Sequence, residues 1–438
     1  MQQRSRGGDV PAPLRPESLA RSNALISREK QAGALNYEPL PVVLSRGEGA
    51  WITDVEGRRL LDLMSAYSAV SFGHAHPRIV GALVEQAQKL AVTSRAYYND
   101  RLPQLMERLA RITGLDRVLP ASGGAEAVET AIKAARKWGH KIKGIPDGRA
   151  AIIACDGNFH GRTITITGLS TDPQYRDGFG PFPTGLSTVP YGDADALERA
   201  ITPDTAAFLV EPVQGEAGII VPPDGYLAAC AAICKRHNVL LIADEVQTGL
   251  GRTGYLLGCE HDGVKPDGVI LGKALGGGLL PVSAFVATEN VMQVFNPGDH
   301  GSTFGGNPLA ATVATAALDV LFDERLIERA RVSGARLMDG LRKIDSPLIL
   351  DIRGRGLLVG IEIDPRLADA RTVVLKMLEH GMLSKDTHGT VVRITPPLNI
   401  EDTALDWAIG EIGKVLREVQ KNPRPDNVPP VRRNTAGP

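Results

Sequence analysis

Short apolar runs typical of β-strands alternate with helical patterns along most of the chain. The runs predicted as strands cover residues 118–119, 151–154, 206–210, 239–243, 268–271 and 283–286. Runs such as LLIA and VILG are apolar at every position, as expected for a strand whose two faces are both covered by helices. The segments 125–139 and 226–238 carry apolar residues at helical spacing. This alternation predicts an α/β fold with a mostly parallel sheet.

The pattern changes after about residue 320. A helical segment over 326–344 is followed by the strand-like run LLVGIEI, another helix and VVRITPP. We therefore predict a large domain over 76–320 and a smaller α+β domain over 321–421, preceded by an N-terminal segment over 21–75. Residues 1–20 and 422–438 are rich in proline and lack apolar periodicity, which predicts flexible tails.

The composition argues against nucleic-acid binding, membrane insertion and a disulfide-rich fold. The chain has 438 residues, of which 43% are hydrophobic and 23% charged, as in an ordinary globular protein. Its 49 basic and 50 acidic residues give a formal charge of −1, so no overall attraction to nucleic acids or anionic membranes is expected. No run of 18 apolar residues is present to span a bilayer. The four cysteines have no disulfide-framework or CxxC spacing, which favours a reducing, cytoplasmic location.

Three groups of residues at predicted strand ends carry candidate chemistry, because ligands of parallel α/β sheets bind beyond the carboxyl ends of the strands. Ser122, Gly123, Gly124 and Ala125 open a helix and could seat a phosphate on its free N–H groups, although most such turns bind nothing. Asp244 follows LLIA, with Glu245 and Gln247 in the same turn. A helix cap or a core ion pair is the alternative interpretation of this aspartate.

Lys273 follows VILG and precedes a glycine-rich run. Burial favours the neutral amine of such a lysine, and a neutral amine can attack an aldehyde. A nucleotide-binding P-loop is excluded, since Asp267 stands where that motif needs glycine and Ala274 where it needs serine or threonine. An anion seat, a carboxylate and an amine on one sheet edge are what pyridoxal 5'-phosphate requires.

Seven motifs then occur in a characteristic order: the run from LNYEPLP to FGHAHP, NFHGRT, VEPVQGEAG, IADEVQTGLGRTG, LGKALGGGLLPVSA, GSTFGGNP and RITPP. Over residues 30–415 the chain resembles the class-III aminotransferases, which are fold-type-I pyridoxal phosphate enzymes. NYEPLP, SAYSAV, TSRAYYN and KDTHGTVVRITPP resemble the members that act on L-ornithine. The resemblance implies a seven-stranded sheet in the large domain and an N-terminal segment that contributes to the small domain and the active site.

The resemblance also implies which residues bind the cofactor. Lys273 would hold it covalently and then carry protons, and Asp244 would pair with the pyridine nitrogen. The ring would lie between Phe159 and Val246, with Gln247 near its 3-oxygen. Gly124 and Ala125 would seat the phosphate, and Gly123 stands where the family has a threonine-like residue. Thr303 would reach the phosphate from the neighbouring subunit, which makes a homodimer part of the active site.

For substrates, the resemblance implies two carboxylate clamps. Arg162 and Tyr37 would hold the carboxylate of L-ornithine far from the reacting amine. Arg393 would bind the α-carboxylate of L-glutamate or 2-oxoglutarate, and Glu216 would neutralise Arg393 until it moves aside. Tyr67 would complete the pocket. The implied reaction moves the δ-amino group of L-ornithine to 2-oxoglutarate and yields glutamate 5-semialdehyde and L-glutamate.

Other interpretations stay open at this point. N-acetylornithine or 4-aminobutyrate could replace ornithine as the amine donor. A non-catalytic binding protein with the same fold is a further possibility, which the presence of Lys273 and Asp244 disfavours. His74 and His76 have metal-like spacing without nearby carboxylates in sequence, so no metal is assigned. The role of His160 in NFHGRT is open.

Overall fold

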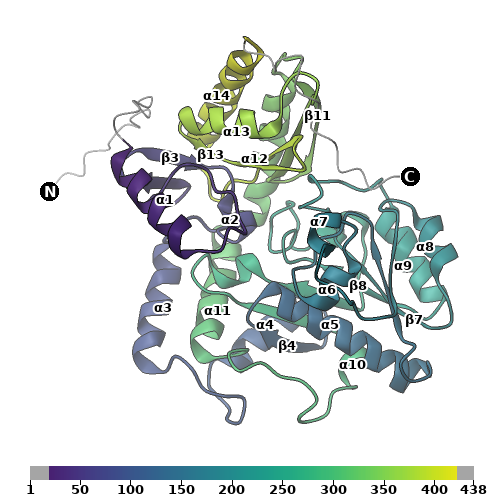
Figure 1. The fold of residues 1–438 in the computed structure, drawn as a ribbon. Helices are drawn as coiled ribbons and strands as arrows, with labels where there is room; N and C mark the ends of the chain where they lie inside the picture. The colour runs from purple at the N-terminus through teal and green to yellow at the C-terminus, as the bar shows by residue number, and fades with distance from the viewer. Residues whose placement is uncertain (1–18, 422–438) are drawn as a thin grey trace.

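The computed structural model describes residues 19–421, which contain three β-sheets and the helices that pack on them (Figure 1). The largest sheet has seven strands in the order β4-β10-β9-β8-β7-β5-β6. β10 pairs antiparallel with both of its neighbours, while the other pairs in this sheet are parallel. Its strands are β4 (Arg117–Ala121), β5 (Ala151–Cys155), β6 (Leu186–Val189), β7 (Thr205–Val210), β8 (Leu240–Asp244), β9 (Gly268–Leu271) and β10 (Ser283–Ala287).

Both faces of this sheet are buried, which explains the apolar runs in the sequence. Successive residues of a strand point to opposite faces, so Phe208 packs into one apolar cluster and Leu209 into another. One cluster includes residues of α5 (Gly124–Trp138), and the other includes residues of α9 (Tyr226–Arg236) and α11 (Pro308–Asp323). The remaining helices of residues 77–323 are α3 (Pro77–Lys89), α4 (Leu102–Thr113), η2 (Gly139–Lys143), α6 (Ile164–Leu169), α7 (Pro173–Arg176), α8 (Ala194–Ala200), η3 (Gly258–Asp262), η4 (Lys273–Gly276) and α10 (Glu289–Met292).

The carboxyl-terminal part forms a second layered unit at the top of Figure 1. An antiparallel sheet in the order β11-β12-β15-β14 packs against α12 and α13, and α14 packs on these two helices. Its elements are α12 (Leu326–Arg342), β11 (Ile349–Arg355), β12 (Leu358–Ile363), α13 (Ala370–Glu379), β14 (Lys385–Thr387), β15 (Val391–Ile394) and α14 (Asp402–Lys421).

The N-terminal segment joins this second unit through a third sheet, β1-β2-β3-β13. Its strand β3 pairs in parallel with β13, which lies more than 300 residues further along the chain. The elements involved are α1 (Ala20–Ala32), β1 (Leu44–Glu48), β2 (Trp51–Asp54), β3 (Arg59–Asp62), α2 (Ser65–Ser68) and β13 (Met382–Leu383). The segment thereby pairs with the small unit, while α2 contacts η4 of the large unit.

The predicted fold class is confirmed, and each predicted strand of the large sheet is present within two residues at either end. The seventh strand, β6, was not assigned to a stretch of sequence, because its residues LSTV are half polar and lie at the sheet edge. The domain boundaries stay a prediction. The predicted tails lie outside the described residues, except that α1 begins at Ala20. Within residues 19–421, none of the helices is long and apolar enough to cross a membrane.

Candidate active site

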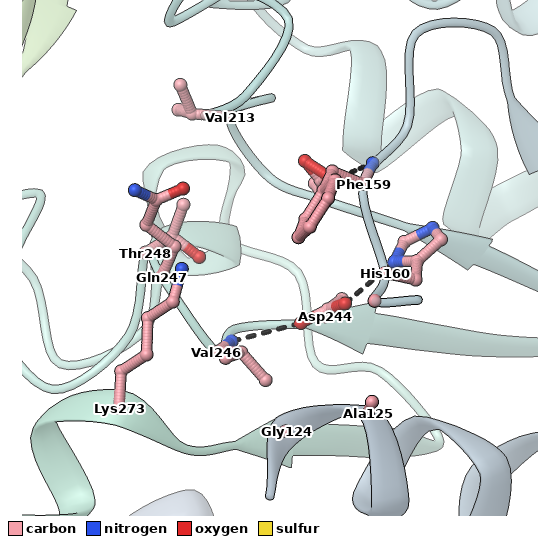
Figure 2. A pocket seen from close by; sticks show the side chains of 12 residues that line it. Gly124, Ala125, Phe159, His160, Val213, Asp244, Val246, Gln247, Thr248 and Lys273 are labelled. Carbon is pink, nitrogen blue, oxygen red and sulfur yellow. Dashed lines mark hydrogen bonds and ion pairs between the residues drawn. The ribbon is translucent and has the colours of Figure 1, made fainter. Parts of the chain in front are cut away.

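A cavity of about 200 Å³ opens at the carboxyl ends of the parallel strands, where ligands of such sheets bind (Figure 2). It is lined by residues from all three of the groups singled out at strand ends in the sequence. Its lining residues are Gly124, Ala125, Phe159, His160, Gly161, Glu211, Val213, Asp244, Val246, Gln247, Thr248 and Lys273. Seven of the eight residues predicted to bind a cofactor are therefore together, and Thr303 is not among them.

Lys273 enters the cavity from the start of η4, two residues after β9 ends (Figure 2). Its backbone has φ 43°, a left-handed conformation that costs a non-glycine residue roughly 1–2 kcal/mol. The buried strand and the 3-10 turn that follows it hold the residue in this conformation. Burial lowers the pKa of the ammonium group below its ordinary value, although Glu216 and Asp244 act in the opposite direction. The amine is thus closer to the neutral form that reacts with carbonyl compounds.

Asp244 ends β8, the strand next to β9, so its carboxylate lies in the same cavity as the amine of Lys273 (Figure 2). One oxygen accepts a hydrogen bond from the backbone N–H of Val246 at 3.1 Å. The other lies 2.7 Å from Nδ1 of His160, which is fully buried. Burial alone would lower the pKa of His160, but the hydrogen bond and charge of Asp244 raise it. His160 and Asp244 therefore form a buried hydrogen-bonded pair, a contact for His160 that the sequence had left open.

Glu211 is a buried carboxyl group that the sequence analysis did not select. It directly follows β7, the next strand in the sheet, and accepts a hydrogen bond from the backbone N–H of Phe159 at 2.8 Å. The pKa of Glu211 is raised to about 7, chiefly by burial. His160 and the hydrogen bond from Phe159 act in the opposite direction and limit this rise. The contact fixes the loop that presents the Phe159 ring to the cavity.

The N-terminus of α5 supplies the predicted anion seat. Gly124 and Ala125 form its first turn, whose N–H groups have no partner within the helix. A side chain at Gly124 would come within 3.1 Å of Val246, so glycine allows the two elements to approach. Gly215 is needed for the same reason beside Gln247. A Cβ at position 215 would lie 1.8 Å from the side-chain amide oxygen of Gln247. Glu245 does not line the cavity; it accepts the N–H groups of the turn at 258–259.

These features fit pyridoxal phosphate. The free N–H groups of α5 suit its phosphate, the Asp244 carboxylate suits a protonated ring nitrogen, and the Lys273 amine suits its aldehyde. Phe159 and Val246 both face the cavity and could contact the two faces of a flat ring. The cavity thus offers a partner for each polar end of this cofactor.

Arg393 and Glu216 form a bidentate ion pair beside the cavity. Both guanidinium-to-carboxylate contacts measure 2.6 Å. The Arg393 side chain is 4% exposed and that of Glu216 is 17% exposed. Burial would raise the pKa of Glu216, but Arg393 lowers it below its usual value. Nε of Arg393 is buried without a hydrogen-bond partner among the described residues.

Tyr67 lies over this pair, with the Arg393 guanidinium carbon 5.3 Å from its ring centre. It belongs to a turn in which residues 65–68 all have positive φ, from 46° to 73°. Four non-glycine residues in this conformation store backbone strain. Asp62 bonds to the N–H groups of Met64 and Ser65, and the Ser65 hydroxyl donates to the carbonyl of Thr395. The turn is therefore held by its surroundings while it presents Tyr67.

The remaining predicted residues lie further out. Arg162 is exposed, and its guanidinium carbon lies 5.3 Å from the ring centre of Phe159. Tyr37 is 77% exposed. The pKa of the Tyr67 phenol is raised mainly by burial, and Tyr37 makes a smaller contribution in the same direction. Thr303 is also exposed. His74 and His76, the pair with metal-like spacing, contact Asp62 and Glu324 respectively.

The family and structure comparisons agree with this geometry. Residues 32–416 match the family model described as aminotransferase class-III. The chain is 52% identical to the ornithine aminotransferase of Bacillus subtilis (strain 168) over 400 residues, covering 91% of this chain and 99% of the relative.

Solved structures are similar over nearly the whole chain. The ornithine aminotransferase of Toxoplasma gondii ME49 superposes with a TM-score of 0.90 at 45% identity and covers 92% of this chain and 96% of its own. A second structure of the Toxoplasma enzyme, with the same score and identity, has partial occupancy of pyridoxal phosphate at its active site and covers 92% and 95%. An acetylornithine aminotransferase from Elizabethkingia anophelis reaches a TM-score of 0.83 at 48% identity, covering 91% and 99%.

Proposed function

Because this chain belongs to the class-III aminotransferase family, we propose that it moves the δ-amino group of L-ornithine to 2-oxoglutarate. The enzyme is a pyridoxal phosphate-dependent transferase. The products are glutamate 5-semialdehyde, which cyclises to pyrroline-5-carboxylate, and L-glutamate. The observation that carries the proposal is the similarity to ornithine aminotransferases, which reaches 52% sequence identity over 91% of this chain. The rival donors are N-acetylornithine, supported by the Elizabethkingia structure, and 4-aminobutyrate.

The cofactor supplies an aldehyde that accepts the amino group and a ring that withdraws electrons from the substrate carbon. In our proposal Lys273 would hold the cofactor through its amine, and the same amine would afterwards move a proton at the substrate carbon. Asp244 would pair with the protonated ring nitrogen, and its contact with Nδ1 of His160 at 2.7 Å holds the carboxylate in place for this role. Gly124 and Ala125 would hold the phosphate together with Thr303 of a second subunit. Phe159, Val246 and Gln247 orient the ring.

Two carboxylate clamps separate the half-reactions. Arg162 and Tyr37 hold the carboxylate of L-ornithine, so that its distal amine reaches Lys273. Glu216 meanwhile neutralises Arg393 and keeps an α-carboxylate away. Because Glu216 is more exposed than Arg393, Glu216 is the partner that moves when glutamate or 2-oxoglutarate binds. Arg393 stays in β15 and then binds the α-carboxylate, with Tyr67 beside it.

We also propose a homodimer. Several large aromatic side chains of the described residues are exposed, among them Tyr97, Tyr98 and Phe304 at 72%, 96% and 55%. Clusters of exposed aromatic residues are typical of interaction surfaces. Phe304 adjoins Thr303, which supports the role of Thr303 in a neighbouring active site. The cytoplasmic location stays a prediction.

A comparison of amine donors tests the proposed reaction. We expect kcat/KM for L-ornithine to exceed the values for N-acetylornithine and 4-aminobutyrate at least about tenfold, since the first competitor carries an added acetyl group and the second lacks the α-amine and one carbon of the chain. The assay measures the first half-reaction with each donor under the same conditions. A higher value for either competitor would refute ornithine as the main donor.

Glu216→Gln should change which amine of L-ornithine reacts. Without the negative charge, Arg393 can bind the α-carboxylate of ornithine, so the ratio of α-amino to δ-amino transfer should rise roughly tenfold or more. NMR of the products distinguishes pyrroline-2-carboxylate from pyrroline-5-carboxylate. Glu216→Asp keeps the charge and serves as the control. An unchanged product ratio in Glu216→Gln would contradict the proposed role of the pair.

A further inference from the structure

A stack of one guanidinium group and two aromatic rings lies beside the cavity. The guanidinium carbon of Arg162 is 3.6 Å from the ring centre of Tyr175 and 5.3 Å from that of Phe159. The two rings meet edge to face, with centres 6.0 Å apart and planes at 78°. Since Phe159 is a wall of the cavity, the stack connects the cofactor pocket to Arg162.

Aromatic contacts are what orient Arg162. Within residues 19–421 its guanidinium group makes no hydrogen bond or ion pair. A guanidinium that lies over a ring uses its flat face, so its N–H groups at the edge stay free. Those N–H groups can then bind a carboxylate through two parallel hydrogen bonds. An unstacked arginine on the surface would have to lose its side-chain freedom on each binding event.

Tyr175 itself is held by neighbours in the chain. It lies in α7, whose first turn is capped by Asp172, which accepts the N–H of Gln174 at 2.8 Å. The next residue, Arg176, donates to the carbonyls of Thr167, Gly168 and Ser170 at 3.3, 2.7 and 3.1 Å. These bonds attach α7 to the end of α6. The Tyr175 ring is therefore a fixed support.

The chemistry of the phenol suits this position. Tyr175 is half-buried, and burial raises the pKa of its hydroxyl group above the ordinary value, although Arg162 acts in the opposite direction. The phenol is thus neutral at physiological pH, so it does not compete with a substrate carboxylate for the guanidinium. The charges of Glu216 and Arg393 also affect this pKa, Glu216 raising it and Arg393 lowering it.

We propose that Tyr175 is a positioning residue that orients Arg162 and thereby selects donors with a carboxylate remote from the reacting amine. The inference rests on the proposed function, because it assigns Arg162 to the carboxylate of ornithine. It adds a residue from α7 to the specificity determinants of the first half-reaction. Its ring acts through Arg162 and has no contact with the reacting atoms.

The test compares L-ornithine with 1,4-diaminobutane, which is ornithine without its carboxylate. In the holoenzyme carrying Tyr175→Leu, we expect KM for ornithine to rise about tenfold with little change in kcat, as expected for the loss of a guanidinium–ring contact. The inhibition constant of 1,4-diaminobutane against ornithine should stay unchanged. Tyr175→Phe keeps the ring and should behave like the unsubstituted enzyme. Phe179→Leu, an exposed aromatic residue beyond the same helix, is the matched control.

Tyr175→Met provides a second variant without a ring, should the leucine protein fail to fold. An unchanged KM in the ringless variants overturns the proposal. So does an equal weakening of ornithine and 1,4-diaminobutane, which would indicate general damage to the pocket, or an equal loss in Tyr175→Phe, which would assign the effect to the hydroxyl. Ornithine turnover by the unsubstituted enzyme reports on the proposed function separately.

Discussion

Replacing Lys273 by alanine is expected to lower the rate of amino transfer from L-ornithine at least about a thousandfold. A positioned general acid-base group alone contributes roughly 10²–10⁴ to a rate, and this variant also loses the amine that binds the cofactor aldehyde. Burial and the left-handed backbone hold that amine at one place in the cavity. Single-turnover kinetics with ornithine measure the loss. The visible absorbance of the lysine-bound cofactor should disappear as well.

Two controls separate this effect from damage to the fold. Lys265→Ala removes an exposed lysine eight residues away in sequence and should leave both the rate and the absorbance unchanged. Added methylamine should restore part of the rate of Lys273→Ala, because a small amine can enter the space left by the side chain. Transfer within tenfold of the unsubstituted rate would rule out the assigned role of Lys273.

The residues at the ends of neighbouring parallel strands could be predicted from the sequence. Asp244 and Lys273 each follow an apolar run, and β8 and β9 are adjacent in the sheet, so their side chains meet in one cavity. Glu211 follows β7 in the same way and is next to Asp244 by register. Its position at the end of a buried strand could therefore have predicted Glu211 as a site residue as well. A carboxyl group buried there without a partner would destabilise the fold.

Other parts of the site depend on contacts that no local pattern encodes. His160 lies in a loop beyond β5, and its bond to Asp244 spans 84 residues. The pairing of Arg393 with Glu216 spans 177 residues and was expected only from the family resemblance. Tyr175 lies in a four-residue helix without a strand before it. In each case the strand order and the packing of loops, rather than spacing, bring the groups together.

Asp244→Asn should slow amino transfer by roughly 10²–10⁴-fold while the protein keeps its fold. Asparagine has nearly the same shape and can still accept the N–H of Val246, but it carries no charge to hold a proton on the ring nitrogen. Charge stabilisation by a preorganised group inside a buried site is typically worth a factor of this size. The rate is measured in the ornithine half-reaction, with bound cofactor quantified for each preparation so that weak binding is not mistaken for slow chemistry.

The buried histidine gives this variant an independent signature. In the unsubstituted protein Asp244 raises the pKa of His160 against the opposing effect of burial. Once the carboxylate is gone, burial dominates, so the pKa of His160 should fall below its ordinary value of about 6.5. NMR titration of the imidazole measures the change in the cofactor-free protein. An unaltered pKa would show that the pair is not coupled as the 2.7 Å contact indicates, and a full rate in Asp244→Asn would show that the ring nitrogen does not need this carboxylate.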